Sequence, residues 1–274
     1  MTFARTLPVL LLLALSSIVP ATGAAALSSV ERRIVASVDR HAPASLELLE
    51  RAVNVNSGTL NLAGVRQVGR LFAPAFESLG FRTEWVEGAA WGRAGHLVAR
   101  RERPGGRPKV LLIGHLDTVF EQDSPFQRFQ RLDDSTAHGP GVSDMKGGDC
   151  VMLLALRALA DAGVLDRLSV VAVLSGDEEK AGLPLEASRR DLRQAADWAD
   201  VAIGFEDGPD DPKLGVVARR GATGWRLRVT GKAAHSSRSS ATTSAMGPSS
   251  RPRGFSMRSG TRSGGSRCSP STPA

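Results

Sequence analysis

The sequence predicts an α/β fold in which a largely parallel sheet is covered by helices on both faces. Between Phe81 and about Arg220, short runs rich in β-branched residues alternate with amphipathic stretches at helical spacing. The chain has 274 residues and 42% hydrophobic content, which is enough to bury a sizeable core.

Two helices are expected before the alternating region. Residues 28–55 and 64–80 both place apolar side chains at intervals of three and four residues. Ser28 and Glu31 have the spacing of a capping box, which ties the first backbone amides of a helix to side chains. We therefore expect the first helix to begin directly after Ser28.

The alternating region divides into strands and helices in a fixed order. Its strands are predicted at 81–87, 96–101, 109–119, 168–176, 201–207 and 215–220, and its helices at about 144–162 and 185–199. In sheets of this kind, ligands bind beyond the carboxyl ends of the strands. The residues that follow each strand are therefore the first candidates for a site.

The N-terminal residues have the layout of a secretory signal. One arginine precedes an apolar stretch over residues 7–19, and small residues follow it. The apolar stretch is too short to cross a bilayer comfortably. We predict a signal peptide over residues 1–26, a mature protein in the periplasm or outside the cell, and no membrane association once the signal is removed.

The C-terminal residues change composition abruptly. After a predicted strand around residues 224–237, Ser, Arg, Gly, Pro and Thr make up 30 of the last 37 residues. Residues 238–274 contain too little apolar surface to fold, so we expect them to be disordered. We hypothesise that this tail is an out-of-frame reading of a GC-rich gene, which resequencing of the locus would decide.

The net charge of +7 does not indicate a nucleic-acid-binding protein. Six of the 35 basic residues lie in the tail, so the first 237 residues carry 29 basic and 28 acidic side chains. A folded domain with this balance lacks the basic face that phosphate backbones require.

Four segments after predicted strands or before a predicted helix carry residues that bind metals. They contain His115 with Asp117 in "GHLDTV", Asp144 in "GVSDMKGG", Glu178 with Glu179 in "SGDEEKAG", and Glu206 with Asp207 in "GFEDG". Each has an ordinary alternative: His115 as a core histidine, Asp144 as a helix N-cap, Glu206 with Asp207 as a turn. Their joint occurrence at successive strand ends favours a metal site.

Imidazole and carboxylate ligands without a thiolate suit zinc, and cobalt or manganese would also fit. Adjacent glutamates can divide their work, because one can bind the metal while the other takes the proton of a water molecule. Cys150 lies within an apolar helical run and is interpreted as a buried hydrophobic residue rather than a nucleophile. A phosphate-binding loop at "TGKAA" is excluded by Arg226 and Ala233, and a serine hydrolase at "HSS" lacks the nucleophile-elbow context.

The five ordered segments "GHLDTV", "GVSDMKGG", "SGDEEKAG", "GFEDG" and "GKAAHS" resemble the M20 family of co-catalytic zinc metallopeptidases, most closely its glutamate carboxypeptidase-like branch. The resemblance covers roughly residues 46–237. It implies a zinc-peptidase catalytic domain over residues 27–221, the beginning of an inserted α+β lid and dimerisation domain over residues 222–237, and a homodimer in the intact family.

The resemblance also implies roles for individual residues. His115 would bind one metal ion and Asp117 would orient it, Asp144 would bridge two ions, and Glu206 would complete the first set. Glu178 would be the general base and acid, and Glu179 would bind the second ion. His235 would contact the substrate carboxylate or the transition-state oxyanion.

The sequence departs from the family after His235, because no further histidine follows to complete the second metal set. We therefore expect a metal-dependent hydrolase, impaired in this chain, that cleaves an amide or peptide bond adjacent to a free carboxylate through a metal-activated water. Its substrates would be small peptides or N-acyl amino acids. The alternative is a catalytically inactive, degenerate binding protein of the same fold.

Overall fold

The computed structural model describes residues 26–105, 107–208 and 214–218. A compact unit ends at Gly215, and the description below concerns this unit. Its N-terminal half contains α1 (Ser29–Val53), α2 (Leu62–Glu77), β1 (Arg82–Glu87), β2 (Gly95–Arg101), β3 (Lys109–His115) and the short strands β4 (Gln130–Arg131) and β5 (Ala137–His138). Its C-terminal half contains α3 (Lys146–Asp161), β6 (Ser169–Ser175), α4 (Leu185–Ser188), α5 (Arg190–Trp198) and β7 (Val201–Gly204).

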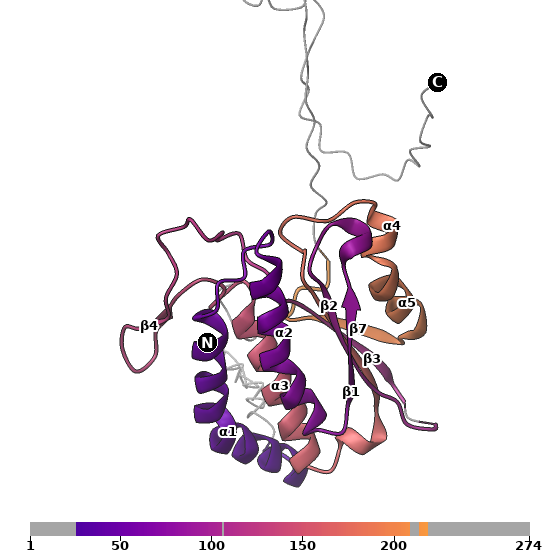
Figure 1. Cartoon of the computed structure of the whole chain (residues 1–274). Helices are drawn as coiled ribbons and strands as arrows, with labels where there is room; N and C mark the ends of the chain where they lie inside the picture. The colour runs from indigo at the N-terminus through magenta and orange to yellow at the C-terminus, as the bar shows by residue number, and fades with distance from the viewer. Residues whose placement is uncertain (1–25, 106, 209–213, 219–274) are drawn as a thin grey trace, which may run out of the picture. The chain divides into compact units, whose positions relative to one another are not determined.

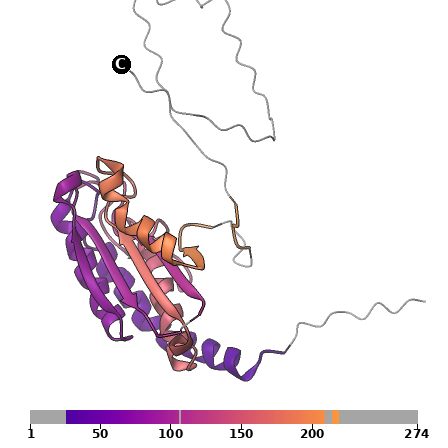
Figure 2. The same cartoon turned by 90° about the vertical axis from the view of Figure 1, so that its right-hand side faces the viewer.

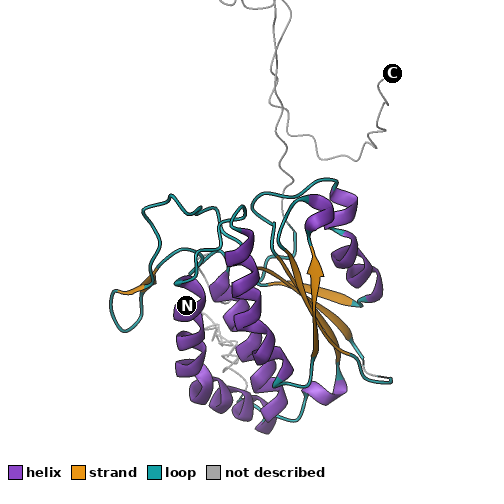
Figure 3. Cartoon of the chain, in the orientation of Figure 1, coloured by secondary structure: helices purple, strands orange, loops and turns teal. Residues whose placement is uncertain are grey.

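The α/β class, with helices on both faces of one sheet, is confirmed. The sheet has the strand order β1-β2-β6-β3-β7. Helices α1, α2 and α3 lie on one face and α5 lies on the other, as Figures 1 and 3 show. Figure 2 views the same layers after a quarter turn.

The sheet is mixed, so the expectation of a largely parallel sheet is wrong for one half of it. Strand β2 is antiparallel to both β1 and β6, whereas β3 is parallel to both β6 and β7. The short connection through residues 88–94 lets β1 and β2 pair as neighbours without a helical crossover, which favours the antiparallel arrangement. The parallel part comprises β6, β3 and β7.

Strands β3 and β6 are buried on both faces of the sheet, which explains their continuous apolar sequences. Side chains alternate between the two cores: Leu112 and Ala172 pack under α1, α2 and α3, while Leu111 and Val171 pack with Ala195 of α5. Strand β7 differs, because all four of its residues are exposed. It is the edge strand on this side of the described sheet.

Helix α1 begins directly after Ser28, as the capping box predicts. Ser28 and Glu31 form the expected capping box, with Glu31 N donating to Ser28 Oγ at 3.2 Å and Ser28 N donating to Glu31 Oε2 at 2.6 Å. The helix expected over 185–199 is interrupted at Arg189, which separates α4 from α5.

The strand expected over 215–220 is absent from residues 214–218, which are exposed and have no strand assignment. The signal peptide, the strand around 224–237 and the tail from Arg238 fall outside the described residues, apart from Ala26. Among the described helices, none combines the length and apolar character needed to cross a membrane.

Candidate metal centre

The parallel strands β6, β3 and β7 end at the same edge of the sheet, and the candidate residues follow them there. His115 is the last residue of β3, Glu178 and Glu179 follow β6, and Glu206 follows β7. Asp144 arrives from the loop before α3. The parallel arrangement therefore gathers segments that are up to 91 residues apart in sequence, counted from 115 to 206.

His115 occupies the centre of the group and is 1% exposed. Its Nδ1 lies 3.1 Å from the carbonyl oxygen of Asp117 and 3.4 Å from Asp117 Oδ1. Its Nε2 lies 2.9 Å from Asp144 Oδ1 and 3.3 Å from Glu206 Oε1. One ring nitrogen is thus held by Asp117 while the other faces two carboxylates from separate segments, which is how a histidine is oriented toward a metal.

Asp144 does not cap α3, so the ordinary alternative for this residue is excluded. The helix begins at Lys146, its N-cap is Met145, and no side chain caps it. The Asp144 side chain instead pairs with His115. Likewise, His115 is not simply a satisfied core histidine, because its Nε2 faces carboxylates at the edge of the sheet.

Asp117 joins the ends of β3 and β6. Its side chain is fully buried, Oδ1 accepts a hydrogen bond from the backbone amide of Glu178 at 3.0 Å, and Oδ2 accepts one from Glu179 at 3.2 Å. Thr59 Oγ1 donates to Oδ2 at 2.7 Å. A carboxylate with several donors is stabilised in its charged form, and despite burial the pKa of Asp117 is lowered by His115, Thr59 and the Glu178 amide.

Two sets of side chains have ligand atoms close enough to share an ion. One consists of His115, Asp144 and Glu206, and the other of His115, Glu178 and Glu179, with ligand atoms within 4.8 Å of one another in each set. Neither set contains a thiol. Cys150 lies elsewhere in the sequence and is buried, and burial raises the pKa of its thiol to about 12. Imidazole and carboxylate donors fit zinc, cobalt or manganese.

The charges around His115 are predominantly negative. Burial disfavours its imidazolium, but Asp117, Glu206 and Asp149 outweigh burial and raise the pKa of His115 to about 10. Burial, followed by the negative charge of Asp144, raises the pKa of Glu179 to about 7. Burial and Asp144 also raise the pKa of Glu206. Carboxylates that resist ionisation beside one another form a site that favours a cation.

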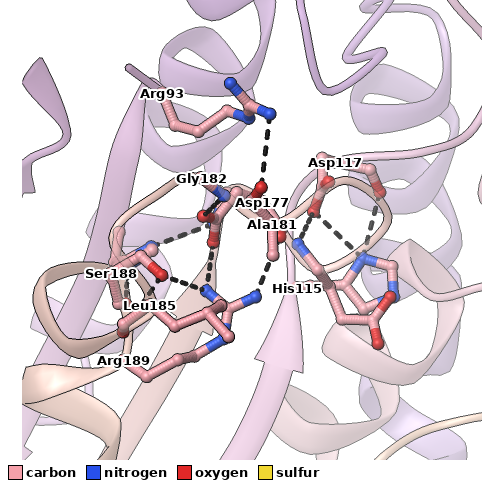
Figure 4. A network of polar contacts seen from close by, with 12 residues as sticks. Arg93, His115, Asp117, Asp177, Ala181, Gly182, Leu185, Ser188 and Arg189 are labelled. Atoms are coloured by element: carbon pink, nitrogen blue, oxygen red, sulfur yellow. Dashed lines mark hydrogen bonds and ion pairs between the residues drawn. The ribbon is translucent and has the colours of Figure 1, made fainter. Parts of the chain in front are cut away.

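Asp177, the first of three adjacent carboxylates in the sequence, faces an arginine instead of the candidate metal centre. Its Oδ1 lies 2.6 Å from Arg189 Nη1, and Figure 4 shows this pair beside His115 and Asp117. The sequence predicts that the three adjacent carboxylates Asp177, Glu178 and Glu179 all face a metal, and the structure shows that this prediction is wrong for Asp177. The Asp177 side chain is directed toward the junction of α4 and α5, where Arg189 lies.

Two buried charged residues on α3 are not among the residues predicted from the sequence. Lys146 is fully buried and donates to the carbonyls of Ala52 at 3.0 Å and Val55 at 3.1 Å. Asp149 is fully buried, and neither of its carboxylate oxygens has a hydrogen-bond partner among the described residues. Burial raises the pKa of Asp149, and Gly114 leaves it room, because a Cβ there would lie 2.0 Å from Asp149 Oδ1. Charged residues within the otherwise apolar sequence of α3 are the pattern that could have indicated these two positions.

The structure thus brings together six of the seven predicted residues: His115, Asp117, Asp144, Glu178, Glu179 and Glu206. The seventh, His235, lies outside the described residues. The individual roles of these residues stay predictions.

Comparison with known proteins places these residues in context. The profile of "Peptidase family M20/M25/M40" matches residues 111–250, just over half of the chain. Carboxypeptidase G2 of Pseudomonas sp. (strain RS-16) is 30% identical over 194 residues, which cover 70% of this chain and 46% of the relative. Acetylornithine deacetylase of Pasteurella multocida (strain Pm70) is 33% identical over 179 residues, which cover 63% of this chain and 43% of the relative.

Among solved structures, human carnosine dipeptidase 1 is similar in fold, with a TM-score of 0.54 and 17% identity over 63% of this chain and 40% of that one. The matched part of this chain thus spans less than half the length of each of these three proteins.

Proposed function

Because the chain belongs to peptidase family M20/M25/M40, we propose that its site serves a metal-dependent hydrolase of the carboxypeptidase or N-acyl-amino-acid deacylase type. The reaction would cleave an amide or peptide bond adjacent to a free carboxylate. The observation that carries this proposal is the geometry at His115, whose Nε2 faces carboxylates from two other segments while Asp117 holds Nδ1.

Zinc is the proposed metal. His115, Asp144 and Glu206 would hold one ion, and Glu179 would hold a second ion together with Asp144. When bound, zinc would polarise the scissile carbonyl and lower the pKa of a water molecule.

The chain's own residues would move the protons. Glu178 is exposed at the end of β6, with its backbone amide fixed by Asp117, so its carboxylate can reach a water molecule at the site. It would take a proton from the attacking water and return it to the leaving nitrogen. Asp117 would act by positioning, because it keeps the His115 ring and the Glu178 backbone in register.

The proposed substrates are small peptides or N-acyl amino acids. Carboxypeptidase G2 and acetylornithine deacetylase, as their names state, are a carboxypeptidase and a deacetylase, which supports this class. We propose further that His235 contacts the substrate carboxylate, that the protein is exported to the periplasm or beyond, and that the lid domain of the complete fold carries the dimer contact. N-terminal sequencing of exported protein would test export, with a first residue expected near Ala24 to Leu27.

The test of the proposed function combines metal binding with hydrolysis. The purified chain should bind zinc in calorimetry and should release glutamate from an N-acyl glutamate, but not from the same compound with its α-carboxylate amidated. The exposed residue Glu186 on α4 offers a matched control, and Glu186→Gln should change neither property. Failure to bind zinc would contradict the proposal. Zinc binding without hydrolysis would favour the alternative of a degenerate binding protein.

A further inference from the structure

The loop that carries Glu178 and Glu179 is shaped by contacts that neither side chain makes. Asp177 Oδ2 accepts a hydrogen bond from the backbone amide of Gly182 at 2.8 Å, which closes residues 177–182 into a compact loop. Asp177 Oδ1 lies 2.6 Å from Arg189 Nη1, and the Asp177 carbonyl accepts from Arg189 Nη2 at 3.0 Å (Figure 4). Arg189 therefore binds the side chain and the main chain of one residue at the base of the loop.

We infer that Arg189 is a positioning residue, which through Asp177 fixes the loop that presents Glu178 and Glu179 to the site. The inference rests on the proposed function, because that function gives the two glutamates their roles. It adds a residue from outside the candidate metal centre.

The ion pair between Asp177 and Arg189 is largely buried. The Asp177 side chain is 0% exposed and the Arg189 side chain is 24% exposed. A buried carboxylate that loses its cation is left with an uncompensated charge, so its segment would rearrange to bring it to water. The planar guanidinium can contact a carboxylate and a carbonyl at the same time, whereas a lysine ammonium acts as a single point charge.

The backbone around Arg189 is connected through His96 to the end of strand β6. Its backbone amide donates to the carbonyl of Leu185 at 2.9 Å, at the break between α4 and α5. The carbonyl of the preceding residue, Ser188, lies 2.7 Å from His96 Nε2, while His96 Nδ1 accepts from the amide of Gly176 at 3.1 Å. His96 is buried and thus links the end of β6 to the residue beside Arg189.

The other side of the loop is held independently. The Asp117 carboxylate accepts hydrogen bonds from the backbone amides of Glu178 and Glu179, and Arg93 Nε donates one to the carbonyl of Lys180 at 2.8 Å. Gly182 fits against Trp91, because a Cβ at Gly182 would lie 2.4 Å from the indole. Because Asp117 and Arg93 remain when Arg189 is replaced, we expect a local loosening of the loop and retention of the fold.

Hydrogen exchange of the purified chain tests the inference without relying on metal or turnover. In Arg189→Met the amides of Glu178, Glu179 and Gly182 should exchange at least tenfold faster, while those of α3 and β3 keep their rates. Arg190→Met is the matched control, because Arg190 is an exposed neighbour that pairs with Asp191. It should leave the loop unchanged. Arg189→Lys should give an intermediate local acceleration, and it replaces Arg189→Met if that variant does not fold.

Zinc titration supplies the second readout, which a general loss of stability would not produce. In a Glu206→Gln background, which keeps the set with Glu178 and Glu179, Arg189→Met should weaken zinc binding at least tenfold. In a Glu179→Gln background, which keeps Asp144 and Glu206, the change should stay below twofold.

Loop exchange that is unchanged, or acceleration spread evenly over the described helices and strands, would overturn the inference. A wild-type chain that binds no zinc would refute the proposed function instead, and the exchange experiment would still decide the role of Arg189.

Discussion

The backbone amide of Glu178 lies 3.0 Å from Asp117 Oδ1. The carboxylate that faces His115 thus also fixes the backbone of the predicted general base, although the two residues are on different strand ends. A change at Asp117 should therefore affect the imidazole and the glutamate loop together.

Replacing Asp117 by asparagine removes the buried charge that accepts hydrogen bonds from Glu178, Glu179 and Thr59. We expect the free energy of unfolding to fall by roughly 2–4 kcal/mol, because hydrogen bonds to charged groups contribute more than neutral ones. Urea denaturation measures this change. Asp123→Asn, at an exposed position, serves as the control. Equal midpoints for Asp117→Asn and the wild type would contradict the inference that Asp117 stabilises the fold by joining the ends of β3 and β6.

The roles of the adjacent glutamates can be separated by two conservative changes. If Glu178 is the general base, Glu178→Gln should lower turnover of an N-acyl glutamate by roughly 10²-fold or more while zinc content stays near normal. If Glu179 is a ligand, Glu179→Gln should lower zinc content, and added zinc should restore part of the activity. Because both side chains belong to one potential ligand set with His115, equal loss of zinc in both variants would show that Glu178 is also a ligand.

The affinity for zinc should rise with pH between about pH 7 and 10. Asp117, Glu206 and Asp149 outweigh burial and raise the pKa of His115 to about 10, so a proton competes with the metal throughout this range. Each pH unit should strengthen binding up to about tenfold, because one proton is displaced. Calorimetry in buffers of different ionisation enthalpy measures the number of protons released. A pH-independent affinity with no proton release would disagree with the pKa of His115.

His115 and Lys146 should make opposing contributions to the stability of the metal-free protein between pH 7 and 10. His115, with its pKa raised from 6.5 to about 10, contributes stability that is present below pH 6.5 and is lost as pH rises through 10. Burial lowers the pKa of Lys146 from 10.5 to about 7, so the unfolded state binds more protons in this range and stability rises with pH. Each effect amounts to at most about 1.4 kcal/mol per pH unit.

Two variants separate these contributions. Relative to the wild type, the unfolding free energy of His115→Gln in the presence of a chelator should rise more steeply with pH, and that of Lys146→Met should rise less or fall. The wild type should lie between the two variants. Parallel pH profiles for the three proteins would show that one of the two titrations is assigned wrongly.

Strand β7 should promote self-association. Val201 and Ile203 are 44% and 45% exposed, and among the described strands only β3 pairs with β7. Placing a charge there, as in Ile203→Lys, should reduce concentration-dependent association in sedimentation equilibrium, because charged edges disfavour strand pairing. Val35→Lys, at a similarly exposed apolar position on α1, is the control. Unchanged association in Ile203→Lys would exclude this edge as the contact.

Most of the elements follow from local patterns in the sequence. The apolar runs of β3 and β6, the spacing of apolar residues in α1 to α3 and the capping box at Ser28 are each readable over a few residues. The ligand types were equally visible, because His115, Asp144 and Glu206 each stand at the end of a strand or before a helix. These features depend on interactions between near neighbours along the chain.

The tertiary structure decided which of these charged groups meet. Asp177, Glu178 and Glu179 are indistinguishable as a sequence of carboxylates, yet Asp177 pairs with Arg189 while the amides of the other two bind Asp117. The antiparallel placement of β1 and β2 and the buried position of Asp149 above Gly114 were likewise not readable. The reason is physical: the partner of a side chain across the sheet depends on strand order and on the direction in which each loop leaves its strand, and no periodicity along the chain records either.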